Sequence, residues 1–381
     1  MFIESFSYKS KNVQINNVDF KKINVLVGAS GAGKTTIINS IRDITGIATG
    51  DSFAGATWQI TLKDALGQLA IWEGRFSKKQ LFIEESEDDD KKAYEIEYES
   101  LSYKGDNIFK KSKDKVIFLG NQLPETSPNI SLLNSYKSDA NVKDIYDAIA
   151  RIRIISTIDT GTIDSDAIPL INPVLQKLVK NFFKDNPEEK ISKLSEQYNI
   201  ESRALLYFAK TYDKASFEDV EYEFTSIFPF IRKINFRTHN FITDKNEKRE
   251  YFFIELQTQD EKIIQQGDIS SGMFKTLNIL SAIYLTSPKS TIILDEVENS
   301  LGVNCLPDII NEISTARQQV IFSSHHPKII NKTPIMNWLI VARKDTNITV
   351  YKASELNIEA GNHDAFTKLL NHHIFHSGVS E

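Results

Sequence analysis

A short glycine-rich stretch near the start of the chain has the spacing of a phosphate-binding loop. Residues 28–35 read GASGAGKT, and they stand between an apolar run at 23–27 and a helical pattern at 36–44. Glycines let successive backbone N–H groups turn toward phosphate oxygens, and the following helix N-terminus adds partial positive charge. A chance glycine-rich turn is the alternative, but the strand–loop–helix context favours nucleotide binding. The predicted nucleotide contacts are Gly28, Ser30, Gly31, Ala32, Gly33, Lys34, Thr35 and Thr36.

Within this loop, Lys34 and Thr35 have distinct predicted roles. The Lys34 ammonium is expected to reach the β- and γ-phosphates of ATP, and the Thr35 hydroxyl is expected to ligate Mg²⁺. A second set of magnesium ligands must then come from elsewhere in the chain. The sequence therefore predicts ATP and Mg²⁺ as the ligands of this site.

Two adjacent carboxylates follow an apolar run at 291–294 and suit phosphoryl chemistry. A buried strand that ends in Asp295 and Glu296 places both carboxylates at the edge of a sheet. Asp295 is expected to hold Mg²⁺ directly or through water, and Glu296 to orient or deprotonate the attacking water. An acidic turn after a core strand is common by itself. Its combination with a phosphate loop favours the catalytic interpretation.

An imidazole at the end of the next predicted strand is a third candidate. Residues 323–327 read SSHHP, and one of the two histidines there could hydrogen-bond the γ-phosphate. A surface or core histidine with an ordinary partner is the alternative. Because ends of neighbouring strands converge on one edge of an open sheet, we favour a role at the phosphate.

These candidates need a parallel sheet to bring them together. Three strongly apolar segments, 291–294, 320–322 and 338–341, are predicted strands, and 305–316 is a predicted helix between the first two. Such strand–helix–strand alternation indicates a parallel sheet. The first helix is expected to stop at Gly46. Further predicted strands lie at 56–62, 68–76, 80–85, 93–103, 116–119, 231–237 and 250–257, and helical spacing occupies about 130–220 and 271–285.

Composition limits the class of protein. Of 381 residues, 41% are apolar and 25% are charged, which is typical of a globular protein with a real core. We expect neither a membrane span nor a secretory signal, and the single Cys305 fits a reducing cytoplasm. The net charge of −6 weakens a case for broad nucleic-acid binding, although a local basic groove stays open. The lysine-rich run 104–115 could meet phosphate backbones of a nucleic acid, but a solvated loop is the favoured interpretation.

In their order and spacing, the phosphate loop, Leu294-Asp295-Glu296 and the strand-end histidine resemble the RecF, SMC and OLD branch of the ABC-type ATPases. That branch carries an S-x-G signature, which matches Ser270-Ser271-Gly272 about 20 residues before Asp295. The resemblance implies that Ser270 and Gly272 open a helix whose N-terminus caps the γ-phosphate of the opposite subunit. A plain helix N-cap is the alternative.

The resemblance also assigns residues around the carboxylates. Residues 295–302, DEVENSLG, resemble the family's D-E-P-E-N-S-L-H, with Val297 and Gly302 as departures. The resemblance implies that residues 299–300 cross a dimer interface. The resemblance also aligns His325 with the family's switch histidine, because His326 falls on a position that is variable in the family. Gln122, after the strand at 116–119, is the candidate for a magnesium-sensing glutamine.

We therefore expect an α/β fold, an ABC-type P-loop ATPase head with a helical insert. The expected division is 1–128 and 221–345 for the two parts of the head, 129–220 for the insert, and 346–381 for a terminal strand and helix. Two heads would sandwich two Mg-ATP molecules as a homodimer or a higher oligomer. No Toprim nuclease domain is expected. The histidines at 363, 372, 373 and 376 are interpreted as surface residues of a terminal helix rather than a metal site.

Two functions remain open at this point. Stand-alone heads of this kind resemble the ATPase components of bacterial anti-phage systems of the Septu, retron-associated and PARIS types. In those systems the ATPase pairs with a separate effector, a nuclease or toxin. The alternative is a RecF-like DNA-repair ATPase that clamps duplex DNA. The low isoelectric point and the absence of a basic stripe favour the first function.

Overall fold

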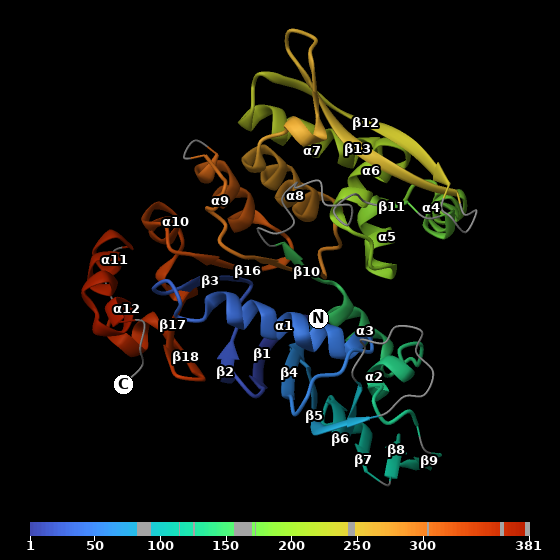
Figure 1. Cartoon of the computed structure of the whole chain (residues 1–381), viewed down its shortest axis with the longest axis vertical. Helices are drawn as coiled ribbons and strands as arrows, with labels where there is room; N and C mark the ends of the chain where they lie inside the picture. Colours follow the sequence, from blue (N-terminus) through green and yellow to red (C-terminus); the bar gives the residue numbers. More distant parts are fainter. Residues whose placement is uncertain are drawn as a thin grey trace. The chain divides into compact units, whose positions relative to one another are not determined.

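The computed structural model describes residues 1–81, 93–113, 115–124, 126–155, 170–171, 173–242, 248–302, 305–358 and 362–377. The chain forms two compact units (Figure 1). The first unit combines both ends of the chain, Met1–Ile154 with Gln319–Glu381, and the second is Ile155–Gln318. No helix among these described residues is long and apolar enough to cross a membrane.

A large mixed sheet is the centre of the first unit. Its strands are β1 (Phe2–Lys9), β2 (Gln14–Asp19), β3 (Ile23–Val27), β4 (Thr57–Lys63), β5 (Leu69–Leu81), β6 (Ala93–Tyr103), β7 (Asp106–Ser112), β8 (Lys115–Phe118), β9 (Asn121–Leu123), β16 (Gln319–Ser324), β17 (Trp338–Lys344) and β18 (Asn347–Lys352). They lie in the order β16-β3-β17-β18-β2-β1-β4-β5-β6-β7-β8-β9. The strand β3 is parallel to both of its neighbours, β16 and β17, whereas β4 to β9 form an antiparallel meander.

Helices cover this sheet: α1 (Lys34–Thr49), α2 (Leu132–Ser135), α3 (Lys143–Ala150), α10 (Pro327–Lys332), α11 (Asn362–Asn371) and α12 (His373–Ser377). The helix α1 lies along the sheet in Figure 1, with α2 and α3 beside it and α12 next to β17. Isoleucines three and four residues apart give α1 its buried face, as expected for an amphipathic helix. They are Ile37, Ile38, Ile41, Ile44 and Ile47.

The end of α1 differs from the predicted stop at Gly46. The helix continues to Thr49, and Gly50 ends it in a left-handed conformation with φ 119°. The backbone N–H groups of Gly50 and Asp51 both donate to the Gly46 carbonyl, at 2.9 and 2.8 Å. Gly46 is thus the acceptor of the C-terminal cap rather than the capping glycine.

The second unit is mainly helical. Its helices are α4 (Pro173–Asp185), α5 (Ile191–Gln197), α6 (Ser202–Tyr212), α7 (Lys214–Ile227), α8 (Ser271–Leu285) and α9 (Leu306–Thr315). Its strands are β11 (Leu170–Ile171), β12 (Ile231–Ile242), β13 (Lys248–Thr258), β14 (Ile263–Gln265) and β15 (Thr291–Leu294), and β10 (Ile152–Ile155) crosses the boundary between the units. The helix α8 contacts α5, α6, α7 and α9, and is therefore buried on nearly every side.

The boundaries of the two units differ from the expected division of the chain. The helices α2 and α3 pack on α1, so that residues 129–154 belong to the first unit rather than to an insert. The helices α5, α6 and α7, which lie in the rest of the predicted insert, pack on α8 in the second unit. Packing partners, rather than the change from strand to helix along the chain, set these boundaries.

The lysine-rich run 104–115 is a strand hairpin and not a solvated loop. Residues 106–112 form β7, which pairs with β6 and β8. Lys111 is buried, and its Nζ donates to the carbonyls of Ser127 and Ile130 at 2.8 and 3.3 Å. Burial lowers the pKa of this lysine. The prediction failed because the local pattern shows only two adjacent apolar residues in β7 before its lysines, whereas pairing with β6 and β8 makes the segment a strand.

Candidate active site

The phosphate loop follows β3 and needs glycine at several positions. Gly31 and Gly33 have φ of 81° and 106°, in the left-handed region that favours glycine. A Cβ atom at Gly28 would lie 2.6 Å from the backbone oxygen of Val341 in β17. The loop therefore takes the conformation that the GASGAGKT pattern predicts, and it lies against a neighbouring parallel strand.

Lys34 and the start of α1 give this loop a cationic interior. The Lys34 side chain is only 7% exposed, and its Nζ donates to the carbonyls of Gly28 and Ala29 at 2.7 and 3.0 Å. The first hydrogen bond of the helix runs from Ile37 N to Gly33 O, so the N–H groups before it have no acceptor inside the helix. Ser30, Gly31 and Thr35 are exposed, and Thr36 is half-buried. This donor set fits phosphate oxygens, and the Thr35 hydroxyl suits a magnesium ion.

The strand register places His325 at the same edge as the phosphate loop. In the parallel pair of β16 and β3, Ser324 is opposite Val27, so that His325 and Gly28 follow at neighbouring strand ends. The His325 side chain is exposed. The next histidine, His326, is the N-cap of α10, and its Nδ1 accepts the Lys328 N–H at 3.2 Å. His326 thus caps a helix, and His325 is the residue that directly follows β16.

Gln122 does not lie beside the phosphate loop that carries Thr35, so the prediction that it senses the magnesium ion there is wrong. It belongs to β9, the last strand in the sheet order of the first unit, whereas β3 is near the other end of that order (Figure 1). The antiparallel meander adds each new strand farther from the phosphate loop. A glutamine after β8 is therefore carried away from the nucleotide rather than toward it.

The two carboxylates of the second unit follow β15, whose residues are all buried. Asp295 is 7% exposed, and its backbone N–H donates to the carbonyl of Ile155 at 3.1 Å. Glu296 is half-buried and has a φ of 44°, which places it in a tight left-handed turn. The side-chain amide of Asn299 donates to the Glu296 carboxylate, and the Asn299 N–H donates to the Glu296 carbonyl at 2.9 Å. This turn gives the Glu296 carboxylate a defined direction.

Sequence reasoning missed Lys275, which lies beneath this turn. Its side chain is fully buried, and its Nζ donates to the carbonyls of Glu296 and Asn299 at 2.6 and 3.0 Å. Burial lowers the pKa of Lys275 to about 8, although the nearby carboxylates of Glu298, Asp295 and Glu296 act in the opposite direction. A signal was present, because Lys275 is the only charged residue in the apolar segment 271–285. Buried lysines require such partners.

The predicted signature residues open α8. Ser270 is exposed and is the N-cap of the helix, where its side chain accepts the Met273 N–H at 3.3 Å. A Cβ atom at Gly272 would lie 2.4 Å from the backbone oxygen of Ser300. Glycine is therefore required where the first turn of α8 packs on the loop after Glu296. The helix start and that loop form one contact surface within the second unit.

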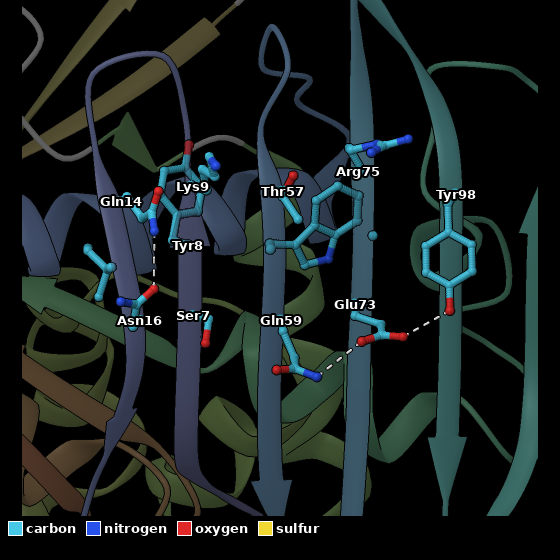
Figure 2. A pocket seen from close by; sticks show the side chains of 13 residues that line it. Ser7, Tyr8, Lys9, Gln14, Asn16, Thr57, Gln59, Glu73, Arg75 and Tyr98 are labelled. Atoms are coloured by element: carbon cyan, nitrogen blue, oxygen red, sulfur yellow. Dashed lines mark hydrogen bonds between the residues drawn. The ribbon is translucent and has the colours of Figure 1, made fainter. Parts of the chain in front are cut away.

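Two other regions with polar or metal-binding side chains do not coincide with these residues. A groove of about 520 Å³ crosses β1, β2, β4, β5 and β6, and none of the predicted site residues lines it. In this groove the Glu73 carboxylate accepts from Gln59 at 3.0 Å and from Tyr98 at 2.9 Å (Figure 2).

The terminal histidines form the second such region. The rings of His372 and His373, at the junction of α11 and α12, stack with centroids 4.6 Å apart. Within the described ranges, no group of three or more His, Cys, Asp or Glu side chains is placed to hold a metal. The side chains at 363 and 376 lie outside the described residues.

Comparison with known proteins identifies the family and the fold. A family described as "AAA domain, putative AbiEii toxin, Type IV TA system" matches residues 23–331. No curated protein matches this chain. Among solved structures, an Smc head bound to the C-winged helix domain of ScpA is similar, with a TM-score of 0.50 and 14% identity, over 92% of this chain and 97% of that one.

Two further solved structures are similar at lower scores. The SMC head domain from Thermotoga maritima has a TM-score of 0.42 and 11% identity, over 92% of this chain and 99% of that one. The Smc head domain with an extended coiled coil from Pyrococcus furiosus, bound to the C-terminal domain of ScpA, has a TM-score of 0.44 and 14% identity, over 97% and 99% of the chains. The family model matches far more than half of the chain, which therefore belongs to the family described as "AAA domain, putative AbiEii toxin, Type IV TA system", and its fold is that of an ABC-type P-loop ATPase head.

Proposed function

We propose that this protein binds Mg-ATP and hydrolyses it in sites that a second copy completes. The observation that carries the proposal is the phosphate loop, in which two left-handed glycines lead into a helix N-terminus and the Lys34 ammonium donates to two carbonyls of the loop. Such a loop fits the β- and γ-phosphates of a nucleotide. Thr35 and Asp295 are the proposed magnesium ligands, and the bound ion would neutralise charge on the phosphates.

Hydrolysis requires that water attack the γ-phosphorus while the bond to the β–γ bridging oxygen breaks. We assign Glu296 to orient that water and to accept its proton, because the turn after β15 and the Asn299 amide fix the carboxylate. His325 is assigned a hydrogen bond to the γ-phosphate, which its position beside the loop supports. ADP and phosphate are the products.

The second copy is assigned the γ-phosphate contact in trans. In the otherwise buried helix α8, Ser270 and Ser271 are exposed at the positive end of the helix. A helix N-terminus binds anions through its first N–H groups and its dipole. In a homodimer, Ser270 and Gly272 of each copy would contact the nucleotide held by Lys34 of the other.

The test separates this role of Ser270 from simple helix capping. Aspartate is as good an N-cap as serine, so Ser270→Asp should keep the stability of α8. Its carboxylate would repel a docked γ-phosphate, however. We expect normal ATP binding, loss of hydrolysis and loss of ATP-dependent dimers, measured by filter binding, phosphate release and light scattering. Hydrolysis at the wild-type rate would reassign Ser270 as a cap alone.

Mixed dimers make the test sharper. Ser270→Asp and Lys34→Ala subunits should each be inactive alone. In a mixed dimer, one composite site has an intact Lys34 facing an intact Ser270. Phosphate release should therefore return when Ser270→Asp is mixed with an excess of Lys34→Ala. If the mixture of the two variants released no phosphate after subunit exchange, the two composite sites would not act independently.

We further propose that ATP turnover controls a separately encoded effector, a nuclease or toxin, in anti-phage defence in the cytoplasm. The family's description, which names a Type IV toxin–antitoxin system, supports a place in a system of more than one protein. The acidic net charge of −6 supports it over a clamp on duplex DNA. A gel shift with duplex DNA and ATP should show no binding. A complex whose affinity falls steeply with salt would instead favour the DNA clamp.

A further inference from the structure

We propose that Lys275 is the positioning residue for Glu296, and that it joins the turn carrying this carboxylate to the first turns of α8. The inference rests on the proposed ATPase function, since it assigns how the proposed general base is held. Lys275 itself faces no solvent, with 0% of its side chain exposed. Any effect of this residue on hydrolysis must therefore pass through its contacts.

The turn after β15 is strained and needs external support. Glu296 and Ser300 both have positive φ values, 44° and 66°, in a region that is unfavourable for residues other than glycine. Between them, the carbonyls of Glu296 and Asn299 both accept from Lys275 Nζ, at 2.6 and 3.0 Å. One ammonium thus holds both ends of the turn in place.

The same contacts determine where the Glu296 carboxylate points. The Asn299 side-chain amide donates to this carboxylate, and the backbone carbonyl of Asn299 is one of the two that Lys275 holds. Movement of Lys275 would shift the Asn299 backbone and with it the amide that aims the carboxylate. The Lys275 ammonium is therefore one residue removed from the proposed reacting atoms.

Lys275 also links this turn to the signature helix. It lies in α8, one turn after Gly272, which itself packs against the Ser300 carbonyl. The start of α8 consequently touches the turn at two points, through a backbone contact and through the ammonium. A shift at Ser270 when a second copy docks would reach Glu296 through this rigid connection.

The alternative is that Lys275 is only a buried counter-ion for the acidic residues around it, Asp295, Glu296 and Glu298. A counter-ion would affect folding stability without a selective effect on the catalytic step. Lys210 offers a matched control in the same unit. Its Nζ donates to the Ile234 carbonyl at 2.7 Å and to the Asn235 side chain at 2.9 Å, and partial burial lowers its pKa.

The experiment compares Lys275→Met with Lys210→Met in the full chain. Both variants lose a lysine contact to a backbone carbonyl. We expect Lys275→Met to bind ATP with wild-type Kd but to show a kcat lowered by about 10²-fold, the effect of a small displacement of a catalytic group. Lys210→Met should keep the wild-type kcat, whatever it loses in Tm.

A double variant tests whether Lys275 acts through Glu296. Lys275→Met combined with Glu296→Gln should be no slower than Glu296→Gln alone, because the group that Lys275 positions is already gone. If the double variant lowered kcat by the product of the two single-variant factors, the proposal would be overturned. A wild-type kcat for Lys275→Met would overturn it as well. If Lys275→Met does not fold, the same measurements on Lys275→Gln decide, since the glutamine amide is uncharged but keeps two N–H donors.

Failure of this inference is distinguishable from failure of the proposed function. If Glu296→Gln hydrolyses ATP at the wild-type rate, the assignment of the general base is wrong. If Glu296→Gln is slow while Lys275→Met is normal, the ATPase assignment stands and Lys275 has no positioning role.

Discussion

Two buried lysines perform opposite tasks at the residue scale. Lys34 donates to the carbonyls of Gly28 and Ala29 in a loop whose next residues are exposed, so its ammonium can reach a ligand. Lys275 donates to the carbonyls of Glu296 and Asn299 and has no exposed surface. The first lysine is suited to binding, and the second is suited to holding a turn.

Lys34→Ala is expected to abolish ATP binding. The variant removes the ammonium that would neutralise the β- and γ-phosphates, whereas the backbone N–H groups of the loop remain. Equilibrium binding of a fluorescent ATP analogue measures the loss. Arg42→Ala, on the exposed side of the same helix, is the control and should bind normally. A Lys34→Ala variant with wild-type affinity would place the nucleotide elsewhere.

Glu296→Gln is expected to keep ATP bound and to slow hydrolysis by about 10²–10⁴-fold, the usual range for loss of a general base. Glutamine still accepts the Asn299 amide, so the turn should persist. The bound, unhydrolysed nucleotide should also hold two copies together. Single-turnover phosphate release and size-exclusion chromatography with ATP measure the two effects, and an unchanged rate would exclude Glu296 as the base.

At the scale of elements, a glycine allows the first turn of α8 to pack directly on the loop after β15. Gly272 allows the backbone of α8 to approach the Ser300 carbonyl, and Lys275 adds a second contact one turn later. Ser270, at the exposed end of the same helix, caps it. The helix thus joins a surface suited to a partner's phosphate to the turn that carries Glu296.

Gly272→Ala is expected to separate these elements. The new Cβ would lie 2.4 Å from the Ser300 oxygen, so that the helix or the loop must shift. We expect a cost of about 1–3 kcal/mol in stability, typical of overpacking, together with reduced ATP hydrolysis. Gly302→Ala is the control, since no atom of the described residues lies within 4 Å of a Cβ there. Thermal melts and phosphate release on both variants test this, and equal behaviour would contradict the contact.

At the scale of the whole molecule, each unit has its own buried polar connection. In the first unit, the fully buried Glu99 in β6 accepts hydrogen bonds from Trp72, from the Ser131 hydroxyl and from the Leu132 N–H. It thereby ties the antiparallel meander to the start of α2. Burial is the dominant effect on this carboxyl and raises its pKa.

The raised pKa of Glu99 gives a prediction for stability against pH. The Glu99 carboxyl binds its proton more tightly in the folded state than in the unfolded state. Its contribution to the free energy of unfolding is therefore fully present below the ordinary pKa of glutamate, and it is lost as pH rises through the pKa of Glu99 in the folded state. Glu99→Gln does not titrate there. We expect the free energy of unfolding of the wild type, minus that of Glu99→Gln, to fall as pH rises above 4.5, the ordinary pKa of a glutamate side chain. A difference independent of pH in urea titrations would contradict the raised pKa.

The sequence by itself determined the local parts of the proposed site. The phosphate loop, the strand before Asp295 and Glu296, and the helix after Ser270 lie where the pattern predicts, and the strands at 93–103 and 291–294 have the predicted bounds. Each depends on residues within a few positions of one another. Glycine geometry, strand periodicity and helix capping act over that range.

Only the tertiary structure decided the rest. The distance of Gln122 from the phosphate loop follows from the order of strands in the sheet, which a local pattern does not contain. The end of α1 at Gly50 depends on which glycine takes the left-handed conformation. Lys275 gains its position because α8 is buried on nearly all sides and the turn after Glu296 supplies two carbonyls. Contacts between residues far apart in the chain determine these features, and they exist only once the chain has folded.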